Sequence, residues 1–318
     1  MAERVPFAAS AIGSFWWEGG LLLKRSLAHQ GIELDLDDRV ADYNNVLSVA
    51  SGKNLMGITM PSFVTWSQRR IGIFADRDVP ELRVIAALNL PVWLAAAVDR
   101  ASGFETLAEL ARARYPWRVV LPPPHNQIGV YIERIMREHG LTRENIVSWG
   151  GADLRPTRSR TPEQQAARER STERAVLATH TAQIARDGTT NGFFLYVNGQ
   201  SAWGRDLTTL LDLRFLRFDE AILDRIIAEW GGTKMNLPAR LFQGVDDDLP
   251  AVGWRHHYIY GKPDVPDELV RAVLHALEDE RILENGHGFS YSALPPQLEP
   301  GLKLHRATEA YFAARQAV

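Results

Sequence analysis

Short apolar runs alternate with longer amphipathic stretches along this chain, and this alternation limits the possible folds more than any other feature. Val5–Ile12 is typical of a strand and Leu21–His29 of a helix. The next pair reverses the order, with a helical pattern at Tyr43–Ser51 and a strand at Met56–Met60. Strands alternating with helices indicate crossover units on largely parallel sheets. The sequence therefore predicts an α/β fold.

The same alternation continues to the end of the chain. Further strands are expected at Leu82–Leu88, Val92–Val98, Trp117–Leu121, Ile146–Trp149, Gly192–Val197, Leu213–Phe218 and Trp254–Tyr260. Further helices are expected at Thr106–Arg114, Gly129–His139, Pro162–Arg186, Phe218–Trp230, Asp267–Asp279 and Leu304–Gln316.

The length of the chain favours two lobes. Its 318 residues exceed the roughly 250–300 at which a single hydrophobic core stops growing. Hydrophobic residues make up 45% and charged residues 24%, as in folded proteins. We expect one lobe from 1–95 with 255–318 and a second from 96–254, sharing one ligand crevice. Two extended crossings, near Val92–Val98 and Ala251–Tyr260, would form the hinge.

Charge and cysteine content exclude several functions. The net charge of −3 gives no global field that would attract nucleic acid, so no nucleic-acid partner is expected. The chain has no cysteine, which rules out disulfides, thiolate catalysis and Cys-ligated metals. No complete phosphate-binding loop, dinucleotide fingerprint or serine-hydrolase elbow is present. No cofactor is therefore expected.

Two groups of potential metal ligands are better explained without a metal. His256 and His257 are adjacent in an expected strand, so their side chains point to opposite faces and cannot chelate one ion. A core or interlobe histidine is the better interpretation. The Asp246-Asp247-Asp248 run lacks the spacing of a calcium loop and indicates an exposed acidic turn.

The C-terminal segment Gly301-Leu302-Lys303-Leu304-His305-Arg306-Ala307-Thr308-Glu309-Ala310-Tyr311 resembles a pattern, LHPGAERYY, that closes the TAXI-type solute receptors of TRAP transporters. Four internal segments follow the order of that family, and they are Ile12-Gly13-Ser14 with Gly19-Gly20, Asn44-Asn45 with Gly52 and Gly57-Ile58, Leu82–Leu88, and Asn191–Phe194 with Asn198-Gly199-Gln200. The resemblance spans nearly the whole chain. It implies a type II periplasmic-binding-protein fold, a small-molecule ligand and TRAP membrane subunits as partners.

Two departures from the family concern the ligand. Pro123-Pro124-His125-Asn126-Gln127-Ile128 stands where the family commonly has Pro-Pro-Gly-Ser-Gly-Thr. In the family, the glycine-rich turn lets backbone N–H groups hold a carboxylate. Here His125 and Gln127 stand in place of the two glycines and narrow that site. Phe15-Trp16-Trp17 replaces a small, hydroxyl-rich first turn. We therefore expect an organic acid, amino acid or aromatic acid that differs from the family's usual ligand.

The candidate ligand-binding residues follow expected strands or precede expected helices. Trp16 and Trp17 are expected in a loop, where indoles could stack on a planar ligand, although either ring could instead fill the core. Capping and turn formation could equally explain the polar members. The full set is Ser14, Phe15, Trp16, Trp17, Asn44, Asn45, Pro61, Ser62, His125, Asn126, Gln127, Asn198, Gln200 and Ser201.

Three functions remain open on the sequence. The first is a solute-binding protein that closes over its ligand by hinge motion. The second is a cofactor-free decarboxylase or lyase on the same fold, with His125 and Glu18 as the acid–base candidates. The third is a cytoplasmic ligand sensor that passes its closure to a protein partner through Arg155–Arg174. The protein would be periplasmic if a signal peptide has been removed, and cytoplasmic if Met1 is the natural start.

Overall fold

The computed structural model describes residues 3–10, 14–38, 43–122, 127–154, 187–199, 202–278, 290–291 and 298–316. The chain divides into two compact units, unit 1 with 1–90 and 254–318 and unit 2 with 91–253. Both boundaries lie inside long strands, β4 (Arg83–Asp99) and β10 (Leu249–Gly261). The boundaries expected from the sequence, 95/96 and 254/255, fall in the same two strands. The predicted α/β class is confirmed.

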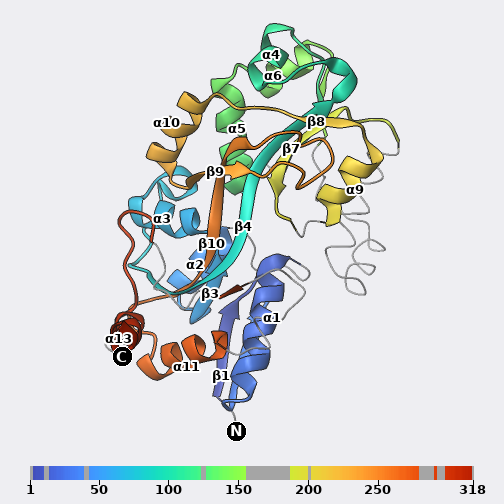
Figure 1. Ribbon diagram of the computed structural model, residues 1–318. Helices are drawn as coiled ribbons and strands as arrows, with labels where there is room; N and C mark the ends of the chain where they lie inside the picture. The colour runs from blue at the N-terminus through green and yellow to red at the C-terminus, as the bar shows by residue number, and fades with distance from the viewer. Residues whose placement is uncertain are drawn as a thin grey trace, which may run out of the picture. The chain divides into compact units, whose positions relative to one another are not determined.

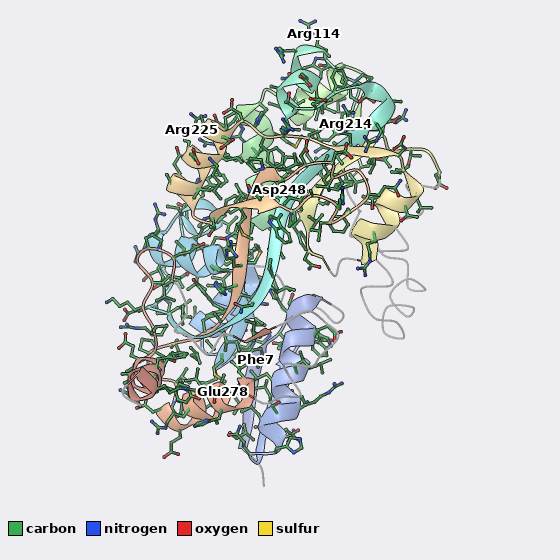
Figure 2. The ribbon with its side chains drawn as sticks, in the orientation of Figure 1. Phe7, Arg114, Arg214, Arg225, Asp248 and Glu278 are labelled. Atoms are coloured by element: carbon green, nitrogen blue, oxygen red, sulfur yellow. The ribbon has the colours of Figure 1, made fainter. Side chains whose placement is uncertain are left out.

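Unit 1 contains parallel strands followed by helices, as predicted (Figure 1). Besides parts of β4 and β10 it holds β1 (Glu3–Ala8), α1 (Phe15–Ala28), β2 (Ile32–Asp37), α2 (Tyr43–Ala50), β3 (Met56–Thr59), α3 (Pro61–Arg69), the short 3-10 helix η1 (Gly72–Phe74), α11 (Asp267–Leu277), β11 (Ser290–Tyr291) and α13 (Arg306–Gln316). The strand order is β2-β1-β3-β10-β4. Phe7 of β1 is fully buried in the core of this unit (Figure 2).

Unit 2 is built on the other ends of the two long strands. It holds η2 (Arg100–Ser102), α4 (Leu107–Arg112), β5 (Arg118–Val120), α5 (Gln127–Glu138), α6 (Arg143–Ser148), β6 (Ala152–Asp153), β7 (Gly192–Val197), α9 (Ala202–Leu210), β8 (Leu213–Phe215), α10 (Glu220–Trp230) and β9 (Thr233–Leu237). Its strands follow the order β4-β7-β5-β6, β8 pairs with β4, and β9 pairs with β10.

The sheet is mixed, so the expectation of largely parallel pairing is only partly right. β1 pairs in parallel with β2 and β3, and β5 pairs in parallel with β6 and β7. The long strand β10 is antiparallel to β3 and β9. The long strand β4 is antiparallel to β7 and β8. The two apolar runs at 82–88 and 92–98 belong to one continuous strand, β4, which runs on through residues 89–91.

The first helix begins earlier than predicted. Ser14 caps α1, and its Oγ accepts a hydrogen bond from the backbone N–H of Trp17 at 3.1 Å. Trp16 and Trp17 therefore lie in the first turn of a helix, and the prediction that they occupy a loop is wrong. Gly20 does not form a turn. A Cβ there would lie 3.1 Å from Ala9 Cβ, so glycine lets the helix pack closely on β1.

Several other sequence predictions are corrected. The strand expected at Ile146–Trp149 is helix α6, which Thr142 caps by accepting from the N–H of Asn145. Two strands, β2 and β9, and two helices, α3 and α9, were not predicted. Pro61 was expected to stop the preceding strand, and β3 does end just before it, at Thr59; the unpredicted part is that Pro61 begins α3, where its missing N–H costs nothing. The helix expected at Pro162–Arg186 lies outside the described residues.

Close packing around Gly192 leads to a test of the core of unit 2. A Cβ at this position would lie 2.2 Å from the carbonyl oxygen of Ala97 and 2.3 Å from Trp117 Nε1. We expect Gly192→Ala to lower the free energy of unfolding by about 3 kcal/mol, because backbone must shift. Urea denaturation measures this. Gly199→Ala is the control, with its nearest atom, Leu241 Cδ1, at 3.4 Å, and equal losses in the two variants would contradict the packing.

Candidate functional site

The carboxyl ends of β1 and β3 lie side by side in unit 1 and form the best candidate site. Phe7 pairs with Met56 and Ala8 with Gly57, and Ser10 and Thr59 each follow the last of these pairs by two residues. From β1 the chain goes through α1 to β2 on one side, and then crosses back through α2 to β3 on the other. This point between β1 and β3 is a topological switch, where open α/β sheets bind ligands.

Three buried polar atoms at this edge have no hydrogen-bond partner among the described residues. They are Asn45 Oδ1, Thr59 Oγ1 and Ser62 Oγ. Asn45 donates its Nδ2 to the carbonyl oxygen of Ile58 at 3.1 Å, which holds its amide against the end of β3. An unsatisfied buried polar group costs about 1–3 kcal/mol, so such groups gathered at one edge point to a functional role.

The first turn of α3 adds a positive field to this edge. The N-cap residue, Met60, makes no side-chain capping hydrogen bond. Backbone N–H groups at a helix start carry a partial positive charge and favour an anion. The start of α1 lies nearby, since the Trp16 and Phe63 ring centroids are 6.3 Å apart in an edge-to-face contact.

Ser10 has a strained backbone at the same edge. Its φ of 71° lies in the left-handed region, and its side chain is buried. Non-glycine residues seldom adopt this conformation, and when they do the strain is often found at functional sites. Ser10 was not predicted, because the residue type of a serine after a strand does not indicate its backbone angle.

Trp16 is a core residue. Its Nε1 donates to His257 Nδ1 at 2.9 Å, and His257 Nε2 lies 3.2 Å from the carbonyl oxygen of Leu90. His257 is fully buried, so its neutral form, with the proton on Nε2, satisfies both partners. The prediction of a satisfied core histidine is confirmed for His257. This chain of bonds ties the first turn of α1 to β10 and β4.

Burial lowers the pKa of His257 to about 3, against a weaker opposing effect of the bond to Leu90. In the unfolded chain the pKa returns to about 6.5, so the unfolded state gains a proton first as the pH falls. The contribution of His257 to the free energy of unfolding is therefore complete above pH 6.5 and is lost progressively as the pH falls towards 3. Between pH 7 and pH 5 we expect a loss of about 2 kcal/mol from this residue.

Denaturant unfolding at a series of pH values measures this loss. Burial also lowers the pKa of His139 and His305, which adds to the wild-type slope. The difference between the slopes of the wild type and His257→Asn isolates His257, because the contributions of the other histidines are present in both proteins and cancel. Identical slopes in the two proteins would contradict a neutral His257.

The remaining predicted residues of unit 1 surround the same edge to different degrees. Trp17 is half-buried in the first turn of α1, and Glu18 is half-buried next to it. Asn44 is exposed, whereas Asn45, Pro61 and Ser62 are buried. The side chain of Phe15 lies outside the described residues.

Few of the predicted residues of unit 2 can be placed. Asn198 is buried directly after β7. The backbone of Gln127 begins α5, and its side chain lies outside the described part of the chain. His125, Asn126, Gln200 and Ser201 also lie outside it, as does the segment 155–174.

Among the described residues of unit 2, two other features stand out, and neither forms a competing site. Asp246 and Asp247 are exposed and pair with Arg100 at 3.0 Å and with Arg217 at 3.1 Å, while Asp248, labelled in Figure 2, accepts from the N–H of Ala239. The predicted acidic turn is thus confirmed. A cavity of about 10 Å³ beside Leu94 and Phe215 has an apolar lining.

Two features are absent from the described residues. They hold no group of three or more histidine or acidic side chains that could bind a metal ion. None of the helices among them is long and apolar enough to span a membrane.

Solved structures of similar architecture cover almost the whole chain. Lactococcal OpuAC, in its closed form with glycine betaine, is 8% identical, with 99% of this chain and 97% of that chain covered and a TM-score of 0.50. PhnD1 from Prochlorococcus marinus (MIT 9301), in complex with methylphosphonate, is 9% identical, with 99% and 98% covered and a TM-score of 0.51. A protein from Bordetella bronchiseptica RB50 is 10% identical, with 100% and 99% covered and a TM-score of 0.51.

The chain has a periplasmic-binding-protein-like fold. No family model matches the sequence, and no curated protein matches it. At these identities the likeness establishes the fold alone, and it confirms the fold that the C-terminal motif implied. This fold places the switch point between β1 and β3 where open α/β sheets hold their ligands.

Proposed function

We propose that this protein is a solute-binding protein whose site in unit 1 takes a small solute with a carboxylate or similar anionic group. The observation that carries the proposal is the set of buried atoms Asn45 Oδ1, Thr59 Oγ1 and Ser62 Oγ, which have no partner among the described residues. The two hydroxyls can donate to an anion, and the first turn of α3 adds a positive field.

The rest of the solute would lie towards the start of α1. Trp17 is half-buried in that turn, and its indole would offer a flat apolar surface to an aromatic acid. Trp16 is a poorer candidate for stacking, because its ring is 6% exposed and its indole N–H already bonds His257. Asn45 can accept from a donor on the solute, such as an amine or a hydroxyl.

We assign the protein more narrowly to the TAXI-type receptors of TRAP transporters. The support is the C-terminal run Gly301–Tyr311 and the four internal segments that follow the order of that family. A receptor of this type would work outside the cytoplasm with TRAP membrane subunits. Because OpuAC and PhnD1 were solved with glycine betaine and methylphosphonate, the same fold is compatible with small polar solutes.

A thermal-shift panel tests the binding proposal. The compounds are acetate, succinate, glutamate, benzoate, phenylacetate and indole-3-acetate, each paired with its uncharged amide. A compound that binds the native state at 100 times its Kd stabilises it by about 2.7 kcal/mol and raises the Tm. We expect at least one acid to raise the Tm and its amide to do so much less.

Chromatography of each hit separates binding from turnover. Recovery of the unchanged acid agrees with a receptor, whereas loss of the acid into a product would identify a lyase or decarboxylase instead. Equal Tm values across the whole panel, or equal shifts by acids and amides, would overturn the proposed anion site.

A further inference from the structure

His256 lies on the same face of β10 as the residues that border the candidate site. Tyr258 is directly opposite Thr59, the last residue of β3. Side chains alternate along a strand, so His256 shares the face of Tyr258, two residues earlier. At that level β3 has already ended and the chain has entered α3 through Pro61 and Ser62. The topology therefore brings His256 to the start of α3.

The two adjacent histidines differ sharply in their hydrogen bonding. Both ring nitrogens of His257 have partners, Trp16 and Leu90, on the other face of the strand. His256 is half-buried, and its Nδ1 is a buried atom without a partner among the described residues. His256 shares a strand face with Tyr258, the residue paired with Thr59, and its Nδ1 resembles Thr59 Oγ1 and Ser62 Oγ in being buried without a partner among the described residues.

We propose that His256 is a further solute-binding residue of this edge, and that its imidazole hydrogen-bonds the anionic group held at the start of α3. The inference rests on the proposed function, since it needs an anionic solute. It adds a specificity-determining residue that the sequence analysis assigned only to the core or the region between the lobes. No catalytic step is involved, because a hydrogen bond to a bound anion is sufficient.

The binding of an anionic solute and the protonation of the His256 imidazole are coupled. Burial, and then the charge of Arg255, lowers the pKa of His256 in the unliganded protein. On the same face, Glu299 acts on Tyr258, whose hydroxyl accepts from the N–H of Glu299 at 3.3 Å. A solute anion stabilises the imidazolium form and raises the pKa, so by reciprocity protonation strengthens binding. Affinity for an acid should rise as the pH falls.

Calorimetric titration with benzoate, acetate and benzamide between pH 8 and pH 6 tests this inference. For the wild type we expect the affinity for an acid that binds to rise roughly threefold to tenfold as the pH falls from 8 to 6. The affinity for benzamide, which carries no charge, should not change with pH. His256→Asn keeps a neutral hydrogen-bonding group, so it should bind the acid at pH 8 with no rise at lower pH. His256→Phe should bind it about tenfold more weakly even at pH 8.

The outcomes separate this inference from the proposed function. A wild-type protein that binds none of the six acids of the thermal-shift panel at any pH contradicts both. Binding with the same pH dependence in His256→Asn, or with unchanged affinity in His256→Phe, overturns the role of His256 and leaves the anion site standing. Circular dichroism and the Tm of each variant confirm that the comparison is between folded proteins.

Discussion

Replacing His257 by leucine is expected to lower the free energy of unfolding by about 2–6 kcal/mol, because two buried polar groups lose their partners at once. The Trp16 indole N–H and the Leu90 carbonyl both bond this imidazole, at 2.9 and 3.2 Å. Leucine is close to histidine in volume and fills the space without offering either bond. Urea denaturation at pH 7 measures the loss.

A matched variant separates the hydrogen bonds from packing. His257→Asn retains an acceptor near the position of Nδ1 and should recover part of the loss. In a double-mutant cycle with Trp16→Phe, the two side chains should couple by about 0.5–3 kcal/mol, as contacting groups do. A loss below 1 kcal/mol for His257→Leu, or additivity within error in the cycle, would contradict the bonded arrangement.

The double variant Thr59→Val with Ser62→Ala is expected to weaken the binding of an acid from the panel at least about 100-fold, since each hydrogen bond to a charged group contributes about 1.5–3 kcal/mol. The Tm without solute should stay the same or rise, because neither hydroxyl has a partner among the described residues. Such opposite effects on binding and stability are typical of residues retained for function.

Thr65→Val provides the control for this pair. Thr65 also lies buried in α3, but its Oγ1 bonds the carboxylate of Glu299. This variant should lose stability and keep its affinity, the reverse of the double variant. Calorimetric titration gives both affinities. If Thr59→Val with Ser62→Ala lowers the Tm and leaves the Kd unchanged, the two hydroxyls are structural and the site is wrongly placed.

Hydrophobic periodicity predicted the main elements because most of them bury a face in the core. The patterns at Tyr43–Ser51 and Gly192–Val197 agree within a residue with α2 and β7. The first helix was placed too late, because Gly19 and Gly20 look like turn residues. Only the packed neighbour, Ala9 Cβ, shows that Gly20 is needed inside a helix. The close approach of two elements cannot be predicted from the local sequence of either one.

The candidate site could be predicted only in part. Ser14, Asn45 and Ser62 were named from their position after strands and before helices, and they lie around the edge of β1 and β3. Thr59 and Ser10 were missed, because the sequence shows neither the absence of a hydrogen-bond partner nor a left-handed backbone angle.

Trp16 illustrates the same limit. Its type and position suit a stacking ligand contact, yet its partner His257 is 241 residues away along the chain. Pairing between distant residues depends on the register of β10 with β3, which no local pattern specifies. Most of the predicted residues of unit 2, near positions 125 and 200, lie outside the described residues, and their roles remain predictions.

A crystal structure of the protein with 4-bromobenzoate tests the proposed site most directly, because anomalous scattering from bromine fixes the orientation of the bound acid. We predict a carboxylate within about 2.5–3.2 Å of a hydroxyl of Ser62 or Thr59, at the start of α3. The aromatic ring should point towards Trp17. An acid bound with its carboxylate away from this edge, or no bound acid in crystals soaked at high concentration, would contradict the proposal.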